Sequence, residues 1–204
     1  MLLAVGLLVA AAVLFLATPD REETKASGSV DVGFAQDMSV HHLQGVQMAN
    51  IARETSRDPA VRQLAFDIET SQLEQAGRMK GWLSLWNQPD LPPGAYMTWM
   101  RQDASHEQHG QGAKAPAMMP GMASAEDLAK LRALAEPEFD TYFLQLMIRH
   151  HQGGAPMMRE AVDRADQPQV RNLAQQMLNA QSSEIDVMTQ MLATRGARPL
   201  PMPN

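Results

Sequence analysis

The chain contains one internal repeat, which constrains its fold more than any other feature. A shift of 109 residues aligns residues 34–83 with residues 143–192 without a gap, and 16 of the 50 aligned positions are identical. The segment FAQDMSVHHLQGVQMANIA lies over FLQLMIRHHQGGAPMMREA. Self-similarity of this kind indicates that one supersecondary unit is present twice, and that the copies pack together to bury their apolar faces.

Each unit is predicted to form two helices. Apolar residues recur largely at helical spacing after Pro59 and again after Pro168, and proline is well tolerated in a first helical turn. Asp31 and Asp140 stand at the expected N-terminal ends of the first helices, where a carboxylate complements the helix dipole. No alternating strand pattern is seen. Two helical hairpins predict an all-α four-helix bundle.

The N-terminal residues are expected to determine the compartment. Leu2 to Ala17 form an unbroken apolar run, which is typical of a secretory signal or a membrane anchor. We expect export with a retained anchor, so that the rest of the chain lies outside the cytoplasm. The expected organisation is anchor 1–18, linker 19–30, bundle 31–195 and tail 196–204, the bundle comprising repeat one 31–86, connector 87–124 and repeat two 138–195.

The connector ends in a signature of a short helix. Ser124 is a candidate cap for a helix over 124–135, with Asp127 three residues later in a position that resembles a capping box.

The histidines fall in three pairs: His41 with His42, His150 with His151, and His106 with His109. A helix turns about 100° per residue, so the first pair shares an arc of about 120° with two methionines, and the second pair does the same in the other unit. Phenylalanines in the same arcs indicate that these faces point to the core. The methionines of the two arcs are Met38, Met48, Met147 and Met157.

Two interpretations of these arcs stay open. The methionines can be core packing, with each imidazole bonded to a carbonyl or carboxylate across the bundle. Alternatively the histidine pairs bind a metal ion, because four buried imidazoles are costly without partners. Thioether with neutral imidazole suits Cu(I) and by extension Ag(I), whereas imidazole alone also suits Cu(II), Zn or Ni. The arcs therefore favour a copper-type ion, Cu(I) or Cu(II), with Ag(I) as a related ion, and they leave Zn and Ni open.

The connector is a second candidate metal site. It is rich in Met and His, and such tracts can capture soft ions without preformed geometry. The alternative is an ordinary loop that Tyr96 and Trp99 anchor to the bundle. The residues concerned are Met97, Met100, His106, His109, Met118, Met119 and Met122.

Several function classes find no support. The net charge is −6 and no Lys/Arg stripe is present, so we expect no nucleic-acid partner. The absence of Cys leaves thioethers and imidazoles as the only soft ligands. No Glu-x-x-His motif of di-iron bundles and no motif of a catalytic nucleophile occurs, so we expect no enzymatic activity and no catalytic residue. The competing function is a non-catalytic structural or interaction subunit of a membrane-associated complex, without a metal site. A homo-oligomer or a membrane-complex partner is expected as a possible assembly.

The segments FAQDMSVHHLQGVQMA, MPGMAS and FLQLMIRHHQGGAPMM resemble the DUF305 family of bacterial exported proteins, over roughly residues 31–195. The resemblance implies a ferritin-like fold and extracytoplasmic binding of copper and silver, for resistance, buffering or trafficking. It implies as ligands Met38, His41, His42, Met48, Met147, His150, His151 and Met157, with Met119 and Met122 of the MPGM motif.

One residue departs from the family pattern. Pro156 stands where the family usually has an apolar helix former, and proline removes a backbone hydrogen bond to Gln152. A kink or helix break is predicted there, which would re-aim Met157 and Met158.

Overall fold

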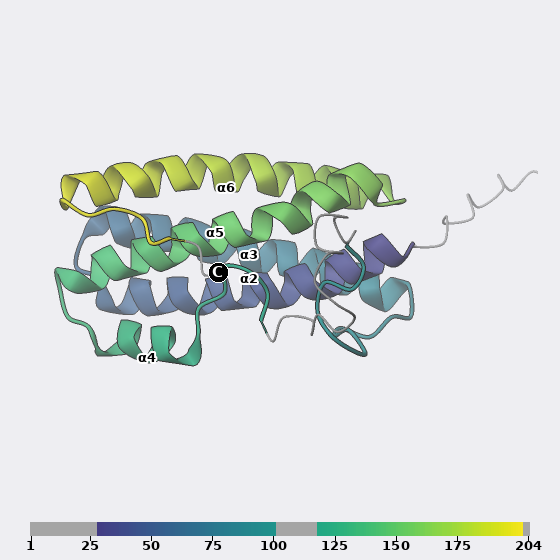
Figure 1. Cartoon of the computed structure of the whole chain (residues 1–204), viewed down its shortest axis with the longest axis horizontal. Coiled ribbons are helices and arrows are strands. Elements are labelled where there is room, and N and C mark those ends of the chain that lie inside the picture. The colour runs from purple at the N-terminus through teal and green to yellow at the C-terminus, as the bar shows by residue number, and fades with distance from the viewer. Residues whose placement is uncertain (1–27, 101–117, 202–204) are drawn as a thin grey trace, which may run out of the picture.

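The computed structural model describes residues 28–100 and 118–201 (Figure 1). These residues form five helices and no strand, which confirms the predicted all-α, ferritin-like four-helix bundle of duplicated hairpins. The anchor predicted for residues 1–18 lies outside the described residues. The helices are α2 (Ser29–Thr55), α3 (Pro59–Leu85), α4 (Ala125–Ala133), α5 (Glu138–Arg164) and α6 (Pro168–Thr194).

The local signals seen in the sequence begin the helices where expected. Helix α3 starts at Pro59 and α6 starts at Pro168. At α4 the Ser124 hydroxyl accepts a hydrogen bond from the Asp127 backbone N–H at 3.0 Å. The Asp127 carboxylate accepts one from the Ser124 N–H at 3.0 Å, so the predicted capping box is present.

The two hairpins meet along α2 and α5. Helix α3 packs on α2, α6 packs on α5, and the two inner helices run in opposite directions (Figure 1). Each of these four helices has 27 residues, with His42 in the middle of α2 and His151 in the middle of α5. Two antiparallel helices of equal length that cross at their midpoints bring their middle residues together.

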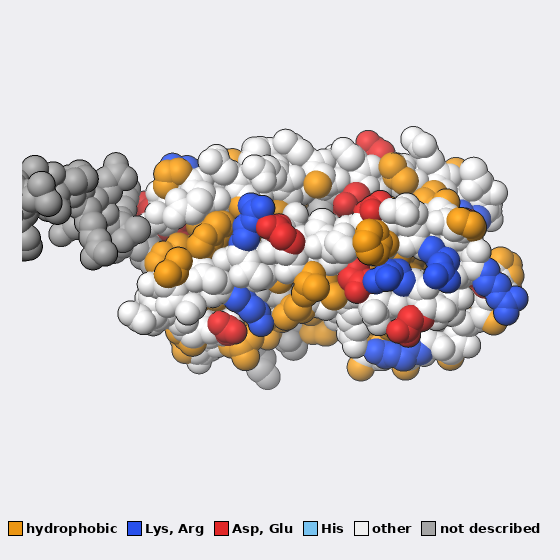
Figure 2. Space-filling model, turned by 180° about the vertical axis from the view of Figure 1, so that it is seen from behind, with side chains coloured by type: hydrophobic (Ala, Val, Ile, Leu, Met, Phe, Trp, Pro, Cys, Tyr) orange, Lys and Arg blue, Asp and Glu red, His pale blue; other side chains and the backbone are white. Residues whose placement is uncertain are grey.

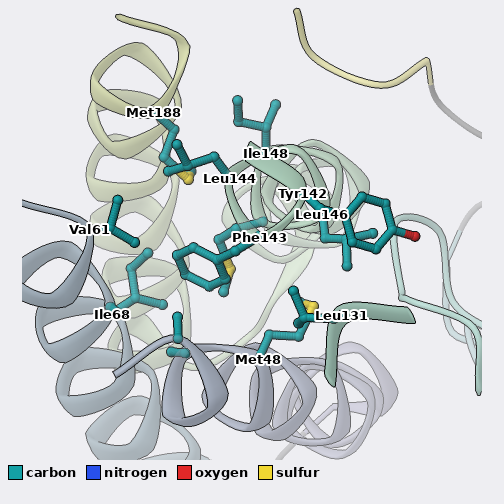
Figure 3. Packing of buried hydrophobic residues seen from close by; sticks show 14 of the residues in the cluster. Met48, Val61, Ile68, Leu131, Tyr142, Phe143, Leu144, Leu146, Ile148 and Met188 are labelled. Atoms are coloured by element: carbon teal, nitrogen blue, oxygen red, sulfur yellow. The ribbon is translucent and has the colours of Figure 1, made fainter. Parts of the chain in front are cut away.

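The apolar interior is divided into two cores, one toward each end of the bundle. The first core contains Met48 and Ile68 with Phe143 and Met188, and Figure 3 shows how these side chains interdigitate. The second core contains Phe34 with Met79 and other residues. On α2 the second core uses residues 30–38 and the first uses residues 48–52, so the histidines lie between the two cores.

Two buried carboxylates tie each hairpin to the loop of the other. Asp31 accepts hydrogen bonds from the backbone N–H groups of Asp166 and Gln167, at 3.2 and 3.0 Å. Its repeat counterpart Asp140 is hydrogen-bonded to Ser56 and lies 3.5 Å from the Arg195 guanidinium. The first turns of α2 and α5 therefore each contact the loop of the other hairpin, although through different donors.

Of the kink or helix break predicted at Pro156, the helix break is wrong. Helix α5 runs without interruption from Glu138 to Arg164. Pro156 lies on the exposed face, where water can solvate the carbonyl that loses its hydrogen bond. Met157 and Met158, which follow the proline, are both fully buried.

The surface shows mixed charge. On the face seen in Figure 2, basic and acidic side chains lie among apolar ones, and no described histidine appears. Among the described residues, no helix combines the length and apolarity that crossing a bilayer requires.

Candidate metal centre

The four paired histidines form one layer at the crossing of α2 and α5. We call His41, His42, His150 and His151 the histidine layer; all four are at most 1% exposed. The rings of His41 and His150 stack across the crossing, with centroids 3.9 Å apart and planes inclined by 30°. The structure thus brings the two pairs from distant parts of the sequence into a single buried cluster.

Two glycines make this close approach possible. A Cβ atom at Gly154 would lie 3.1 Å from Cε1 of His41, and one at Gly45 would lie 3.1 Å from Cε1 of His150. Gly45 and Gly154 are repeat counterparts, so each helix leaves room for the imidazole of the other.

Each ring of the histidine layer has a hydrogen-bond acceptor at Nε2. His41 Nε2 lies 3.2 Å from the Pro120 carbonyl, and His150 Nε2 lies 2.9 Å from the His41 carbonyl. On the outer helices, Gln75 Oε1 is 2.8 Å from His42 Nε2, and a Glu184 carboxylate oxygen is 2.6 Å from His151 Nε2. A carbonyl or carboxylate oxygen only accepts, so these contacts place the ring proton on Nε2.

The opposite nitrogen of each ring has no partner. All four Nδ1 atoms are buried and lack a hydrogen-bond partner among the described residues. With the proton on Nε2, a neutral ring exposes a lone pair at Nδ1. Metal-binding histidines in proteins have this arrangement, in which the ring N–H is donated to a carbonyl or carboxylate and the other nitrogen coordinates the ion.

Burial keeps the rings of His41, His42 and His150 neutral, because it lowers their pKa values. Burial lowers the pKa of His41 to about 4, and burial with the nearby His41 lowers that of His42 to about 3. The pKa of His150 falls well below its ordinary value because of burial and the neighbouring rings. A neutral imidazole is the form that binds a metal ion.

The methionines of the predicted arcs are buried, but the two methionines of each arc lie in different cores. Met38 of α2 packs in the second core with Met157 and Met158 of α5. Met48 of α2 packs in the first core with Met147 of α5. Because α2 and α5 are antiparallel, the thioethers on each side of the histidine layer come from different repeats.

The MPGM segment of the connector is docked against the histidine layer. The Gln44 side-chain amide accepts from the Ala123 N–H at 2.6 Å and donates to the Ala123 carbonyl at 2.8 Å. Gly121, at φ +79°, packs directly against Gly153. A Cβ atom at Gly153 would lie 2.2 Å from the Pro120 carbonyl oxygen. This contact aims that carbonyl at His41.

The other connector residues differ in burial. Met119 is buried in the second core, while Met97, Met100 and Met122 are partly buried against it. Met118 is 45% exposed. His106 and His109 lie outside the described residues.

The predicted aromatic anchors of the connector do pack on the bundle. Tyr96 and Trp99 are partly buried against the second core, and Trp99 meets Phe34 edge-on at 6.1 Å. The Trp99 indole donates to the buried Asp37 carboxylate at 2.8 Å. Burial raises the pKa of Asp37.

Sequence reasoning missed the acceptors that orient the rings. Gln75 and Glu184 each stand 33 residues after the second histidine of their pair, so they are repeat counterparts. The repeat therefore contained a signal for them. The partners of His41 and His150 are backbone carbonyls and leave no signal in the sequence.

The donor set fits a soft ion of low coordination number better than a hard one. Among the described residues, no group of three or more His, Asp or Glu side chains is arranged to hold a metal. The available donors are imidazole nitrogens and nearby thioethers, which suit Cu(I) and Ag(I). The rings of His41 and His150 are stacked, so an ion bound by both Nδ1 atoms would require the stack to open.

Comparison with known proteins gives one matching family model. The model of DUF305, a domain of unknown function, matches residues 31–192. No curated protein matches the chain.

Several solved structures are similar. A DUF305 protein from Streptomyces coelicolor, described as a candidate secreted protein, is 40% identical, with 85% of this chain and 98% of that chain covered and a TM-score of 0.74. A DUF305 fragment from Deinococcus radiodurans is 34% identical, with coverages of 82% and 98% and a TM-score of 0.66. CopM in its Cu(I)-bound form is 25% identical, with coverages of 80% and 96% and a TM-score of 0.59. CopM has also been solved in Cu(II)-bound and Ag-bound forms.

Proposed function

The chain belongs to the DUF305 family, and from this premise we propose that it binds a soft metal ion, Cu(I) or Ag(I), in the histidine layer. The observation that carries the proposal is the set of four buried Nδ1 atoms without partners, on rings whose Nε2 atoms all meet acceptors. A purely structural imidazole would gain by satisfying both nitrogens, because an unpaired buried polar atom costs about 1–3 kcal/mol.

The relatives support the same chemistry. CopM, which shares this fold, binds Cu(I), Cu(II) and Ag. The described methionines next to the layer add soft thioether donors on both sides. We therefore favour a non-catalytic role in metal buffering, resistance or trafficking outside the cytoplasm. The candidate secreted relative from Streptomyces coelicolor supports that compartment.

The direct test is metal titration of purified protein with Cu(I), Cu(II) and Ag(I). The double variant His41→Asn/His150→Asn keeps a neutral polar group at each position but removes the imidazole nitrogens. We expect it to lose most of the Cu(I) and Ag(I) affinity. A matched control, His106→Asn/His109→Asn, changes the same residue type in the connector and should retain tight binding.

The opposite pattern would refute the assignment. If the His41/His150 variant is folded by circular dichroism and still binds Cu(I) as tightly as the parent, the histidine layer is not the site. If the parent protein binds neither Cu(I) nor Ag(I), the histidines are core residues that only hydrogen-bond across the bundle. A pull-down for protein partners then becomes the relevant experiment.

A further inference from the structure

A small cavity opens between α5 and α6 beside the histidine layer. It has a volume of about 190 Å³, and its lining includes His151, Met158 and Gln181. Gln181 is 5% exposed, and its side-chain carbonyl oxygen has no hydrogen-bond partner among the described residues. The cavity is therefore lined by an imidazole, a thioether and an unpaired amide oxygen.

The other repeat is built differently at the same positions. Gln152 and Ser182, which line the cavity, correspond to Leu43 and Leu73 in the first repeat. Met158 corresponds to Ala49, which has no donor atom. The second repeat thus has two polar residues where the first has two leucines, and a thioether where the first has the methyl group of an alanine.

Met158 extends from the cavity to the centre of the layer. It lines the cavity, and its terminal methyl group would lie 3.6 Å from a Cβ built at Gly154. The same Cβ position is 3.5 Å from His41 Nδ1. The Met158 side chain therefore lines the cavity and ends beside Gly154, next to which the unpaired His41 Nδ1 also lies.

We propose that this cavity is the entry port through which a soft monovalent cation, Cu(I) or Ag(I), reaches the histidine layer. The Met158 thioether is the ligand that passes the ion from the cavity toward His41 and His150. A flexible side chain with a polarizable sulfur suits transient coordination. The inference rests on the proposed function and assigns it a direction of entry, from the α5–α6 side.

The port carries one negatively and one positively charged side chain. Glu184, whose side chain is 22% exposed, holds His151 and adds negative charge beside the cavity. Arg159 lines the cavity and adds positive charge that opposes an entering cation. The port therefore predicts opposite kinetic effects for removing the thioether and for removing the guanidinium.

Loading kinetics of the full protein test the port. The metal-free protein is mixed with a coloured Cu(I) chelate, and transfer is followed by the loss of chelate absorbance. Ser182→Leu installs the residue of the first repeat and narrows the cavity, so loading and release should both slow by about tenfold, because entry then requires a conformational opening. The equilibrium affinity should stay within a factor of two of the parent. Met158→Leu should also load slowly, while Arg159→Gln should load faster.

Two matched controls complete the design. Ser183→Leu adds the same side chain one position along α6, outside the cavity lining, and Leu73→Ser makes the reverse change in the first repeat; both should load at the parent rate. If folded Ser182→Leu and Met158→Leu proteins load as fast as the parent while equilibrium binding is intact, the port is wrong and the proposed function survives. If the parent takes up no Cu(I) at equilibrium, the proposed function fails and the port fails with it.

Discussion

A buried imidazole presents two nitrogens, and each ring of the histidine layer has a protein acceptor for only one of them. The acceptors are of three kinds: the backbone carbonyls of Pro120 and His41, the amide of Gln75 and the carboxylate of Glu184. They fix the tautomer of the metal-free rings, which would reduce the reorganisation that the proposed binding of an ion requires.

The buried neutral rings predict acid sensitivity of the metal-free protein. The folded-state pKa values of His41, His42 and His150 lie below the unfolded value near 6.5, so below that pH the unfolded chain binds more protons. The free energy of unfolding should be at its full value above pH 6.5 and fall toward pH 4, by up to about 1.4 kcal/mol per pH unit for each ring. Urea unfolding between pH 7.5 and 4.5 measures this.

Two carboxyl groups have the opposite effect on the pH dependence of the free energy of unfolding. The raised pKa values of Asp37 and Asp140 favour the folded state as the pH falls. The His41→Asn/His150→Asn protein lacks two of the buried imidazoles. Its free energy of unfolding should therefore fall less steeply between pH 6.5 and pH 4 than that of the parent. A slope equal to that of the parent would show that the layer does not control acid stability.

A pair of glycine substitutions tests the docking of the connector. In Gly153→Ala the new Cβ would lie 2.2 Å from the Pro120 carbonyl oxygen. This oxygen belongs to the backbone, so the connector would have to move away from α5 to relieve the clash. We expect a loss of about 1–3 kcal/mol in the free energy of unfolding. Gly77→Ala, in α3 with nothing within 4 Å, should instead gain about 0.5–1 kcal/mol. Thermal melts would compare them, and equal Tm values would contradict the docking.

At the scale of elements, the sequence predicted what local signals control. The proline starts of α3 and α6 and the Ser124 capping box depend on neighbouring residues, and the structure has them. The 109-residue repeat predicted the pairing of hairpins. The regrouping of Met38 with Met157 could not be predicted, because it depends on the direction in which α2 and α5 cross.

Pro156 shows why a local rule failed. Proline costs a helix stability at exposed positions too, but here the buried residues that follow Pro156 in α5 offset the cost, so that the helix continues. Pro156→Gln, which installs the residue found at this position of the first repeat, should restore the hydrogen bond to Gln152. We expect a gain of about 1–3 kcal/mol in the free energy of unfolding, by urea titration. Unchanged Cu(I) affinity should accompany it, and a loss of stability would show that the proline is needed.

At the scale of the whole molecule, the hairpins are joined by the α2–α5 crossing and by the two buried carboxylates at its ends. Asp31→Ala removes the acceptor for the Asp166 and Gln167 backbone N–H groups. We expect a loss of about 2–4 kcal/mol in the free energy of unfolding. Asp67→Ala, at an exposed position within α3, should change it by less than about 0.5 kcal/mol. Similar urea midpoints for the two variants would show that Asp31 does not tie the hairpins together.

The midpoint position of the histidines makes helix length itself a constraint. One residue inserted in α2 ahead of His41 would turn the pair by about 100° and shift it by about 1.5 Å, so that it would no longer face its counterpart. A matching insertion in α5 would not repair this, because it would rotate the second pair as well. Evolutionary gains and losses of residues should therefore concentrate in the connector, while the four 27-residue helices keep their length.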